Sequence, residues 1–309
     1  MDKFFHFLAE HKKIKFNFIF LLIFTCFLTL KLDTLSAVTQ PVNYQINSFS
    51  SYPVNFTNTP APYLSSRSAI VIDVDSKAII YQKNPDLKLL PASTTKIMTA
   101  LVALDNYKLS DIVTIGNIQV EPTNMNLIPG EKITVENLLY GLLVASANDS
   151  AVALAQFYPT GEAGFVAAMN QKAQDLHLDS TQFINPIGLD NYNHYTTVHD
   201  LSLLAAVVLQ NSEFAKIVST IAITVTDTDN TVIHELKNVN QLLGQVPGLA
   251  GVKTGLTQLA GECLVAYVQR DGHRIITVIL DSSDRFGETR ALIDWVFANY
   301  RWETLSAIH

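Results

Sequence analysis

Hydrophobic residues along this chain follow two spacings, and the spacing changes between the ends and the middle of the region after residue 66. Near both ends, short runs rich in β-branched residues come in pairs, and each pair surrounds a polar turn signal. Such pairs are typical of β-hairpins. The first pair is residues 69–74 and 77–81 around Asp75-Ser76, and the second is residues 263–269 and 274–280 around Asp271-Gly272.

Between the two predicted hairpins, and again after the second, hydrophobic residues recur at the intervals of amphipathic helices. Strands near both ends with helices between them predict an α/β protein of the α+β type, with one antiparallel sheet flanked by helices. The two ends of the folded region are expected to meet at that sheet. The predicted helices are residues 94–104, 135–157, 164–176, 198–209 and 288–300.

A third pattern lies near the N-terminus, where an uncharged apolar run from Phe16 to Leu30 follows Lys12, Lys13 and Lys15. This order is typical of membrane targeting, although a comfortable spanning helix needs about 20 residues. We favour an uncleaved anchor over a cleaved signal peptide, because Ser36-Ala37 is a poor cleavage site. The lysines stay inside, so the bulk of the protein is expected outside the cytoplasm.

Residues 34–66 carry no charged side chain and are dense in Ser, Thr, Asn, Gln and Pro without any period. This composition is typical of a linker. We therefore expect three parts: a short cytoplasmic tail with the anchor or signal segment (1–33), an uncharged polar linker (34–66) and a folded domain (67–309). The domain is expected to be held at the extracytoplasmic face of the membrane, or to be secreted or periplasmic if the signal is cleaved.

The composition, 48% hydrophobic and 16% charged, is that of a globular protein. The net charge of −7 excludes a phosphate-tracking surface, so no nucleic-acid partner is expected. Beyond the N-terminal segment the sequence has one cysteine, Cys263, which rules out an intrachain disulfide there and is expected to be a buried small hydrophobe. The histidines show no ligand-like grouping, so no metal is expected.

Candidate chemistry begins at Pro91-Ala92-Ser93-Thr94-Thr95-Lys96, which opens a predicted helix. Ser93 would lie in the first turn, with Lys96 three residues on and on the same face. A serine becomes a nucleophile when a base takes its proton, and burial or nearby cations can lower the pKa of a lysine enough to make it that base. A lone S-x-x-K motif is weak evidence for a catalytic pair, because a capping serine followed by a solvated lysine gives the same sequence.

Two further polar clusters stand out. Ser146-Ala147-Asn148 interrupts the apolar run LLYGLLVASANDSAVALA, which costs stability unless the side chains are used; a helix break capped by Ser and Asn is the alternative. Ser146 can relay a proton between Lys96 and a leaving amine, and the Asn148 amide can bind a substrate backbone. Lys253-Thr254-Gly255 is expected on an edge strand, where the lysine adds positive potential beside Lys96, the threonine can bind a carboxylate and the glycine admits another backbone.

The order S-x-x-K, S-x-N, K-T-G is that of penicillin-binding proteins and class A β-lactamases. Over residues 67–300 the sequence resembles the low-molecular-mass D-alanyl-D-alanine carboxypeptidases, which are penicillin-binding proteins. The resemblance rests on the stretches LLPASTTKIMTALVALD, GEKITVENLLYGLLVASANDSAVALA and GVKTGLTQLAGECLVAYVQRDGHRIITVIL. It implies a DD-peptidase/β-lactamase-like fold: a five-stranded antiparallel sheet, an inserted helical subdomain and an active site in the cleft between them.

By this resemblance, Ser93 attacks the carbonyl between the two terminal D-alanines of a peptidoglycan stem peptide. Lys96 takes the serine proton, Ser146 passes a proton to the departing D-alanine, and water hydrolyses the acyl-enzyme. β-Lactam antibiotics are expected to acylate Ser93 as covalent inhibitors. No cofactor is implied.

The resemblance also implies a set of residues that hold the substrate. The backbone N–H groups of Ser93 and Leu256 would form the oxyanion hole. Arg285 is a candidate second ligand for the carboxylate, with a surface arginine as the alternative. Ile187 stands where the family often has histidine, so the positioning of its loop is in question. The substrate-binding residues are Asn148, Lys253, Thr254 and Gly255.

Other activities use the same three motifs. An endopeptidase that cuts D-alanyl cross-links stays open, as does a β-lactam or cell-wall binding domain without turnover. A class A β-lactamase is disfavoured, because no E-x-x-L-N string occurs between Asn148 and Lys253. A cross-linking transpeptidase is disfavoured because such enzymes more often carry a long additional module.

Overall fold

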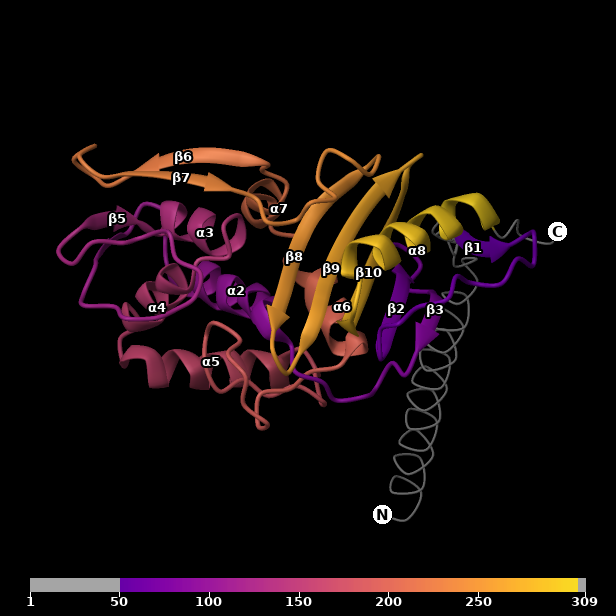
Figure 1. Cartoon of the computed structure of the whole chain (residues 1–309), viewed down its shortest axis with the longest axis horizontal. Coiled ribbons are helices and arrows are strands. Elements are labelled where there is room, and N and C mark those ends of the chain that lie inside the picture. Colours follow the sequence, from indigo (N-terminus) through magenta and orange to yellow (C-terminus); the bar gives the residue numbers. More distant parts are fainter. Residues whose placement is uncertain (1–50, 305–309) are drawn as a thin grey trace, which may run out of the picture. The chain divides into compact units, whose positions relative to one another are not determined.

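The computed structural model describes residues 51–304, which contain a central sheet and a helix-rich part (Figure 1). The sheet has five antiparallel strands in the order β3-β2-β10-β9-β8. Both predicted hairpins are confirmed, and the K-T-G segment lies on an edge strand, as expected. The strands are β2 (Ser68–Asp73), β3 (Ile79–Lys83), β8 (Leu249–Thr257), β9 (Gly261–Arg270) and β10 (His273–Ser282).

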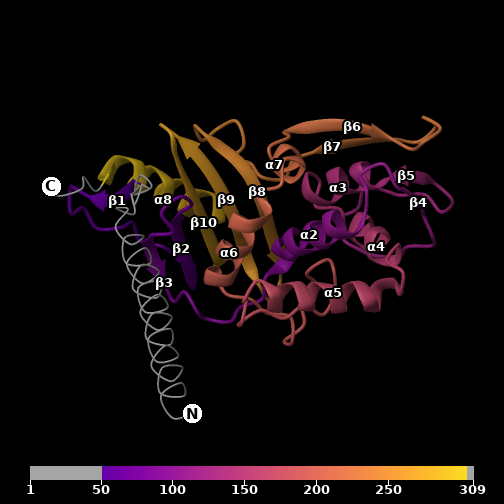
Figure 2. The ribbon, with the colours of Figure 1, turned by 180° about the vertical axis from the view of Figure 1, so that it is seen from behind.

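Both faces of the sheet are covered, which explains why its strands read as continuous apolar runs. Along β2, Ile70 and Ile72 belong to the core shared with α6 (Val198–Val208), whereas Ala69 and Val71 belong to the core shared with α8 (Arg285–Asn299). Successive side chains of a strand point to opposite faces, so a strand buried on both sides needs apolar residues throughout. Figures 1 and 2 show α8 and α6 on opposite faces.

The helix-rich part follows β3 and is inserted before β8. Its first element is the 3₁₀ turn η1 (Ala92–Thr95), which leads directly into α2 (Lys96–Asn106), a helix buried over most of its length. Four of the predicted helices are confirmed as α2, α5, α6 and α8. The remaining elements are β4 (Ile112–Thr114), β5 (Lys132–Thr134), α3 (Val135–Leu143), α4 (Asn148–Gln156), α5 (Gly161–Asp175), α7 (Ser212–Val218), β6 (Ala222–Thr226) and β7 (Ile233–Lys237).

The predicted helix at residues 135–157 is wrong in its middle. The helix α3 ends at Leu143, and α4 begins at Asn148. Between them Ser146 has a φ of 59°, in the left-handed region that a continuous helix cannot contain. The alternative of a helix break is confirmed, but its capping by Ser and Asn is wrong, because the residue before α4 is Ala147, which makes no side-chain capping bond. The break presents the two polar side chains to the interior.

The predicted linker, residues 34–66, extends too far toward the carboxyl end. Within it, β1 (Tyr52–Asn55) pairs antiparallel with β11 (Tyr300–Glu303). Farther on, Leu64 and Ser66 are buried. The segment lacks charge and period because neighbours distant in sequence, not a face of its own, hold it in place. Of the described residues, 52–66 therefore belong to the folded domain.

The N-terminal anchor or signal (1–33) and the first part of the linker lie outside the described residues. Among residues 51–304, no single helix is long and apolar enough to cross a membrane; α6 and α7 reach the required length only together, with a bend of 114°.

Over the same residues, no group of three or more His, Cys, Asp or Glu side chains is arranged to hold a metal ion. Cys263 is buried, as expected, and burial raises the pKa of its thiol to about 12.

Candidate active site

The turn that carries Ser93 has a strained backbone, and two glycines allow other segments to pack closely against it. Ala92 has a φ of 48°, a conformation that costs about 1 kcal/mol for a residue with a Cβ. A Cβ on Gly188 would overlap the carbonyl of Ala92. A Cβ on Gly255 would lie 3.1 Å from the backbone nitrogen of Ser93. Both glycines thus let neighbouring backbone approach the nucleophile's turn, which confirms the expectation for Gly255.

Lys96 is buried, and its ammonium nitrogen has three neighbours. Nζ donates to Oδ1 of Asn148 at 2.8 Å and to the carbonyl of Ile187 at 3.0 Å, and it lies 3.0 Å from Oγ of Ser93. Burial lowers the pKa of Lys96 to about 7, against an opposing effect of the Asp149 carboxylate. A neutral amine has two N–H bonds and one lone pair. With both N–H bonds directed at Asn148 and Ile187, the lone pair faces the Ser93 hydroxyl.

Lys253 lies on β8 and is also buried. Its Nζ donates to Oγ of Ser146 at 2.9 Å and to the carbonyl of Thr254 at 3.0 Å. Burial, and then the positive charges of Lys96 and Arg285, hold the pKa of Lys253 well below its ordinary value. The sequence motifs predict Lys96 as the proton partner of Ser146. The structure instead places Ser146 in a hydrogen bond with Lys253.

Asn148 is buried and lies beside Lys96. Its Oδ1 accepts from Lys96, and its Nδ2 donates to the carbonyl of Glu121 at 3.1 Å. The amide therefore fixes the position of the lysine. The carboxylate of Asp149, next in sequence, accepts backbone N–H bonds from Met125 and Leu127, each at 3.0 Å. Together the two residues tie α4 to the preceding loop.

Arg285 lies at the start of α8 and reaches the K-T-G strand. Its Nη1 donates to the carbonyl of Gly255 at 2.6 Å. This contact puts the guanidinium beside the K-T-G strand, and its role as a second carboxylate ligand stays a prediction. Arg285 is half-buried, and its Nε atom is buried. Leu256 follows on the same edge strand with its side chain exposed.

The loop that contains Ile187 is shaped by one asparagine. Oδ1 of Asn185 accepts from the backbone N–H groups of Ile187, Gly188 and Leu189, at 3.2, 2.7 and 3.2 Å. This arrangement turns the carbonyl of Ile187 toward Lys96. The side chain of Ile187 is buried and contributes no polar group. The contact with Lys96 therefore does not depend on whether residue 187 is histidine or isoleucine, because the backbone carbonyl of that residue makes it.

Sequence reasoning missed His194, which is buried beneath the nucleophile's turn. Its Nδ1 accepts from the backbone N–H of Ile184 at 3.3 Å, so Nε2 carries the proton and donates to Oγ1 of Thr95 at 2.9 Å. Thr95 in turn donates to the carbonyl of Ala92 at 2.8 Å. Burial lowers the pKa of His194 to about 4, which keeps the ring neutral. No spacing in the sequence marks this residue, because its partners are distant.

The fold and this arrangement of Ser93 and Lys96 define the class of serine acyl-transfer enzymes that use a lysine as base. Residues 55–284 match the S11 peptidase family, described as D-alanyl-D-alanine carboxypeptidase. The chain belongs to this family, as its sequence motifs imply.

Three relatives illustrate the match. The D-alanyl-D-alanine carboxypeptidase DacF of Bacillus subtilis is 35% identical over 250 residues, which cover 78% of this chain and 64% of DacF. The crystal structure of the Streptomyces K15 DD-transpeptidase superimposes with a TM-score of 0.73 at 32% identity, covering 78% of this chain and all of that one. A D-alanyl-D-alanine endopeptidase of Pseudomonas aeruginosa is 32% identical over 228 residues, 72% of this chain and 73% of the relative. The five-stranded fold implied by the sequence is thereby confirmed.

Proposed function

We propose that this protein is a serine-type D-Ala-D-Ala carboxypeptidase that removes the terminal D-alanine from peptidoglycan stem peptides. The observation that carries the proposal is the lone-pair geometry at Lys96, whose amine has its two N–H bonds engaged and faces Ser93 at 3.0 Å. A base with a pKa of about 7 is half unprotonated near neutral pH. Matching family members of that name support the same activity.

The first half-reaction follows from these positions. Oγ of Ser93 attacks the carbonyl carbon of the penultimate D-alanine as its proton passes to Nζ of Lys96. Negative charge then develops on the carbonyl oxygen, which the backbone N–H groups of Ser93 and Leu256 are proposed to bind. The close approach of β8 to Ser93, enabled by Gly255, supports this pairing of donors.

Collapse of the intermediate breaks the C–N bond and leaves an acyl ester on Ser93. The departing amine of D-alanine takes the proton of the Ser146 hydroxyl, and Lys253, at 2.9 Å, can replace that proton. Water then attacks the ester and gives its proton to Ser146 and so to Lys253, while Ser93 recovers its proton from Lys96 as the ester bond breaks, which returns both lysines to their starting states. Thr254 and Arg285 are proposed to bind the terminal carboxylate, because an arginine fork suits a carboxylate and lies beside that strand.

Two other reactions share the acyl-enzyme and differ in what leaves or attacks. The P. aeruginosa relative favours an endopeptidase as the second candidate, since a cross-link presents the same D-alanyl bond. The absence of a long additional module no longer disfavours transpeptidation. The Streptomyces K15 DD-transpeptidase is matched over its full length by 78% of this chain. For location, we propose the extracytoplasmic face of the membrane, on the strength of the lysine-flanked apolar run at residues 16–30.

Product analysis separates these possibilities. The protein is incubated with a stem pentapeptide, a cross-linked dimer and penicillin in parallel, and the products are read by mass spectrometry. A carboxypeptidase releases D-alanine from the pentapeptide and retains a penicilloyl adduct on Ser93. Ser93→Ala should lose both signals while its thermal unfolding stays unchanged. Adduct formation in that variant, or a stable adduct with no D-alanine from any peptide, would contradict the proposal.

A further inference from the structure

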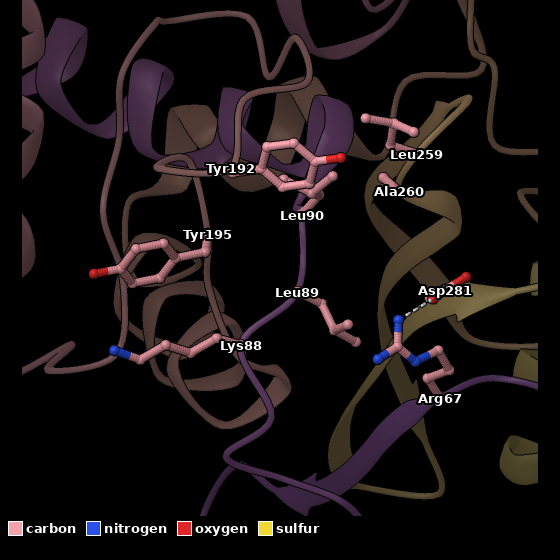
Figure 3. A pocket seen from close by; sticks show the side chains of 9 residues that line it. All are labelled: Arg67, Lys88, Leu89, Leu90, Tyr192, Tyr195, Leu259, Ala260 and Asp281. Carbon is pink, nitrogen blue, oxygen red and sulfur yellow. Dashed lines mark hydrogen bonds and ion pairs between the residues drawn. The ribbon is translucent and has the colours of Figure 1, made fainter.

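Charged side chains outside the active site occur in two different settings. The first is an open pocket of about 510 Å³ beside the chain that leads into the nucleophile's turn (Figure 3). There Arg67 is paired with Asp281 at 3.0 Å, and the ammonium of Lys88 lies 4.6 Å from the centre of the Tyr195 ring. Both cations of this pocket are thus engaged by neighbours. The second setting is a buried pair of side chains under the β6–β7 hairpin.

His234 and Glu131 form this buried pair. His234 lies on β7, in the hairpin that runs beside α3 (Figures 1 and 2), and the two side chains are 3% and 0% exposed. Nε2 of His234 is 2.7 Å from Oε1 of Glu131, and Nδ1 is 2.9 Å from the carbonyl oxygen of Met125. The other carboxylate oxygen of Glu131 accepts from the backbone N–H of Ile128 at 3.0 Å.

Both ring nitrogens of His234 face oxygen atoms, so the ring is bonded in two directions. A carbonyl oxygen only accepts, which means that Nδ1 carries a hydrogen and donates it to Met125. A neutral imidazole has one N–H, so the contact at Nε2 uses a further proton, carried by the ring or by the carboxyl group of Glu131. An amide side chain at this position could take the place of only one of the two nitrogens.

Met125 connects the buried pair to the start of α4. Its carbonyl accepts from His234, and its own N–H donates to Oδ1 of Asp149 at 3.0 Å. Residues 121–127, to which Met125 belongs, form neither helix nor strand in the structure. This segment is therefore held by side chains, with His234 on one side and α4 on the other.

The same segment fixes Asn148. The carbonyl of Thr123 accepts from the backbone N–H of Asn148 at 2.7 Å, and the carbonyl of Glu121 accepts from its Nδ2 at 3.1 Å. Oδ1 of Asn148 then accepts from Lys96 at 2.8 Å, which is one of the two bonds that leave the lysine lone pair facing Ser93. A displacement of the segment would reach the base through this amide.

We propose that His234 is a positioning residue for the acylation of Ser93. Through its bond to Met125 it holds residues 121–127 where they orient Asn148 and, through Asn148, the amine of Lys96. The inference rests on the proposed function, since it takes Lys96 as the base. Stability alone gives no reason for the pair, because apolar side chains of similar volume usually stabilise a core as well as a buried ion pair does.

The test compares two amide variants of His234, each of which keeps one of the two bonds. In His234→Asn the amide takes the place of Nδ1 and can donate to Met125, whereas in His234→Gln it takes the place of Nε2 and can donate to Glu131. Penicillin acylation of Ser93 is measured at the plateau of the pH profile, where Lys96 is unprotonated. His234→Asn should stay within about threefold of the wild-type rate, and His234→Gln should be about tenfold slower.

Thermal unfolding separates positioning from support of the fold. His234→Asn leaves the carboxylate of Glu131 buried without its partner, whereas His234→Gln leaves only a backbone carbonyl, and an unpaired buried charge costs more. His234→Asn should therefore unfold at the lower temperature although it acylates faster. If it does not fold, the double variant Glu131→Gln/His234→Asn, which removes the unpaired charge, takes its place with the same expected rate.

Glu235→Gln, on the exposed face of the same strand, is the control and should acylate like the wild type. Equal rates in the two His234 variants, slower acylation in His234→Asn, or slower acylation in whichever variant is less stable would overturn the proposal. A wild type that forms no penicilloyl adduct on Ser93 would instead contradict the proposed function. The two failures are thus distinguishable.

Discussion

Two lysines are buried at the candidate active site, one on the helix α2 and one on the strand β8, and their neighbours give them different properties. Lys96, on the helix, has two oxygen acceptors and the Ser93 hydroxyl around its Nζ, with the negative charge of Asp149 close by. Lys253, on the strand, has one hydroxyl and one carbonyl, and the charges near it are positive. Burial lowers the pKa of both.

The difference shows that burial alone does not determine the role of a lysine. At Lys96 the geometry leaves one direction free for a proton, and that direction is the nucleophile. Lys253 is directed at Ser146, so it can supply or stabilise a proton on the leaving-group side. We therefore assign proton acceptance to Lys96 and electrostatic support to Lys253. The following experiments test this division of roles.

The largest effect is expected from Lys96→Gln. Loss of a general base slows proton transfer by about 10²- to 10⁴-fold, so penicillin acylation of Ser93 should fall by about that factor. Stopped-flow or mass-spectrometric acylation rates measure it, and thermal unfolding serves as the control for folding. Acylation within about threefold of the wild type would remove Lys96 from the mechanism.

Lys253→Met should have a smaller effect on the same rate. The variant keeps the unbranched shape of the side chain but removes its charge and the bond to Ser146, which we expect to slow acylation about 10²-fold, as for loss of one electrostatic contact. The pH dependence that Lys96 imposes should persist. If the fall in acylation rate at low pH (the acid limb) disappeared in this variant, the roles assigned to Lys96 and Lys253 would have to be exchanged.

His194 tests whether the turn beneath Ser93 needs its support. His194→Ala should slow acylation about tenfold, because the Thr95 hydroxyl, which donates to the Ala92 carbonyl, loses the donor that orients it. His194→Gln can restore a donor and should recover most of the rate. Counting active sites by penicillin stoichiometry separates mispositioning from unfolding. Equal rates in both variants, with fully active sites, would contradict a positioning role.

The smallest effect is expected from Asp149→Asn. The carboxylate of Asp149 raises the pKa of Lys96 against the effect of burial, so its removal should lower that pKa further. The acid limb of acylation should then move to lower pH by about one unit or less. Asparagine can replace only part of the contacts of Asp149 to Met125 and Leu127, so the rate itself can fall for structural reasons. The quantity to measure is therefore the pH at which the acylation rate is half of its limit. A shift to higher pH would contradict the account.

Local pattern predicted the two hairpins, four of the helices and the residues of all three motifs. It failed where distant contacts decide the conformation. The pairing of Tyr52 with Glu303 leaves no period in the linker-like segment, and the left-handed Ser146 interrupts a run that is apolar enough for one helix. The partners of Asn148 and His194 were unpredictable for the same reason, since each is set by a carbonyl or hydroxyl that only the fold brings close.

The central claim, that neutral Lys96 is the base, is tested most directly by the pH dependence of Ser93 acylation by penicillin in the wild type. The second-order rate should be low when Lys96 is protonated, rise through half its limit at a pH of about 7, and level off above it. A rate independent of pH between 5 and 9, or a limb near the ordinary lysine pKa of about 10.4, would contradict the account.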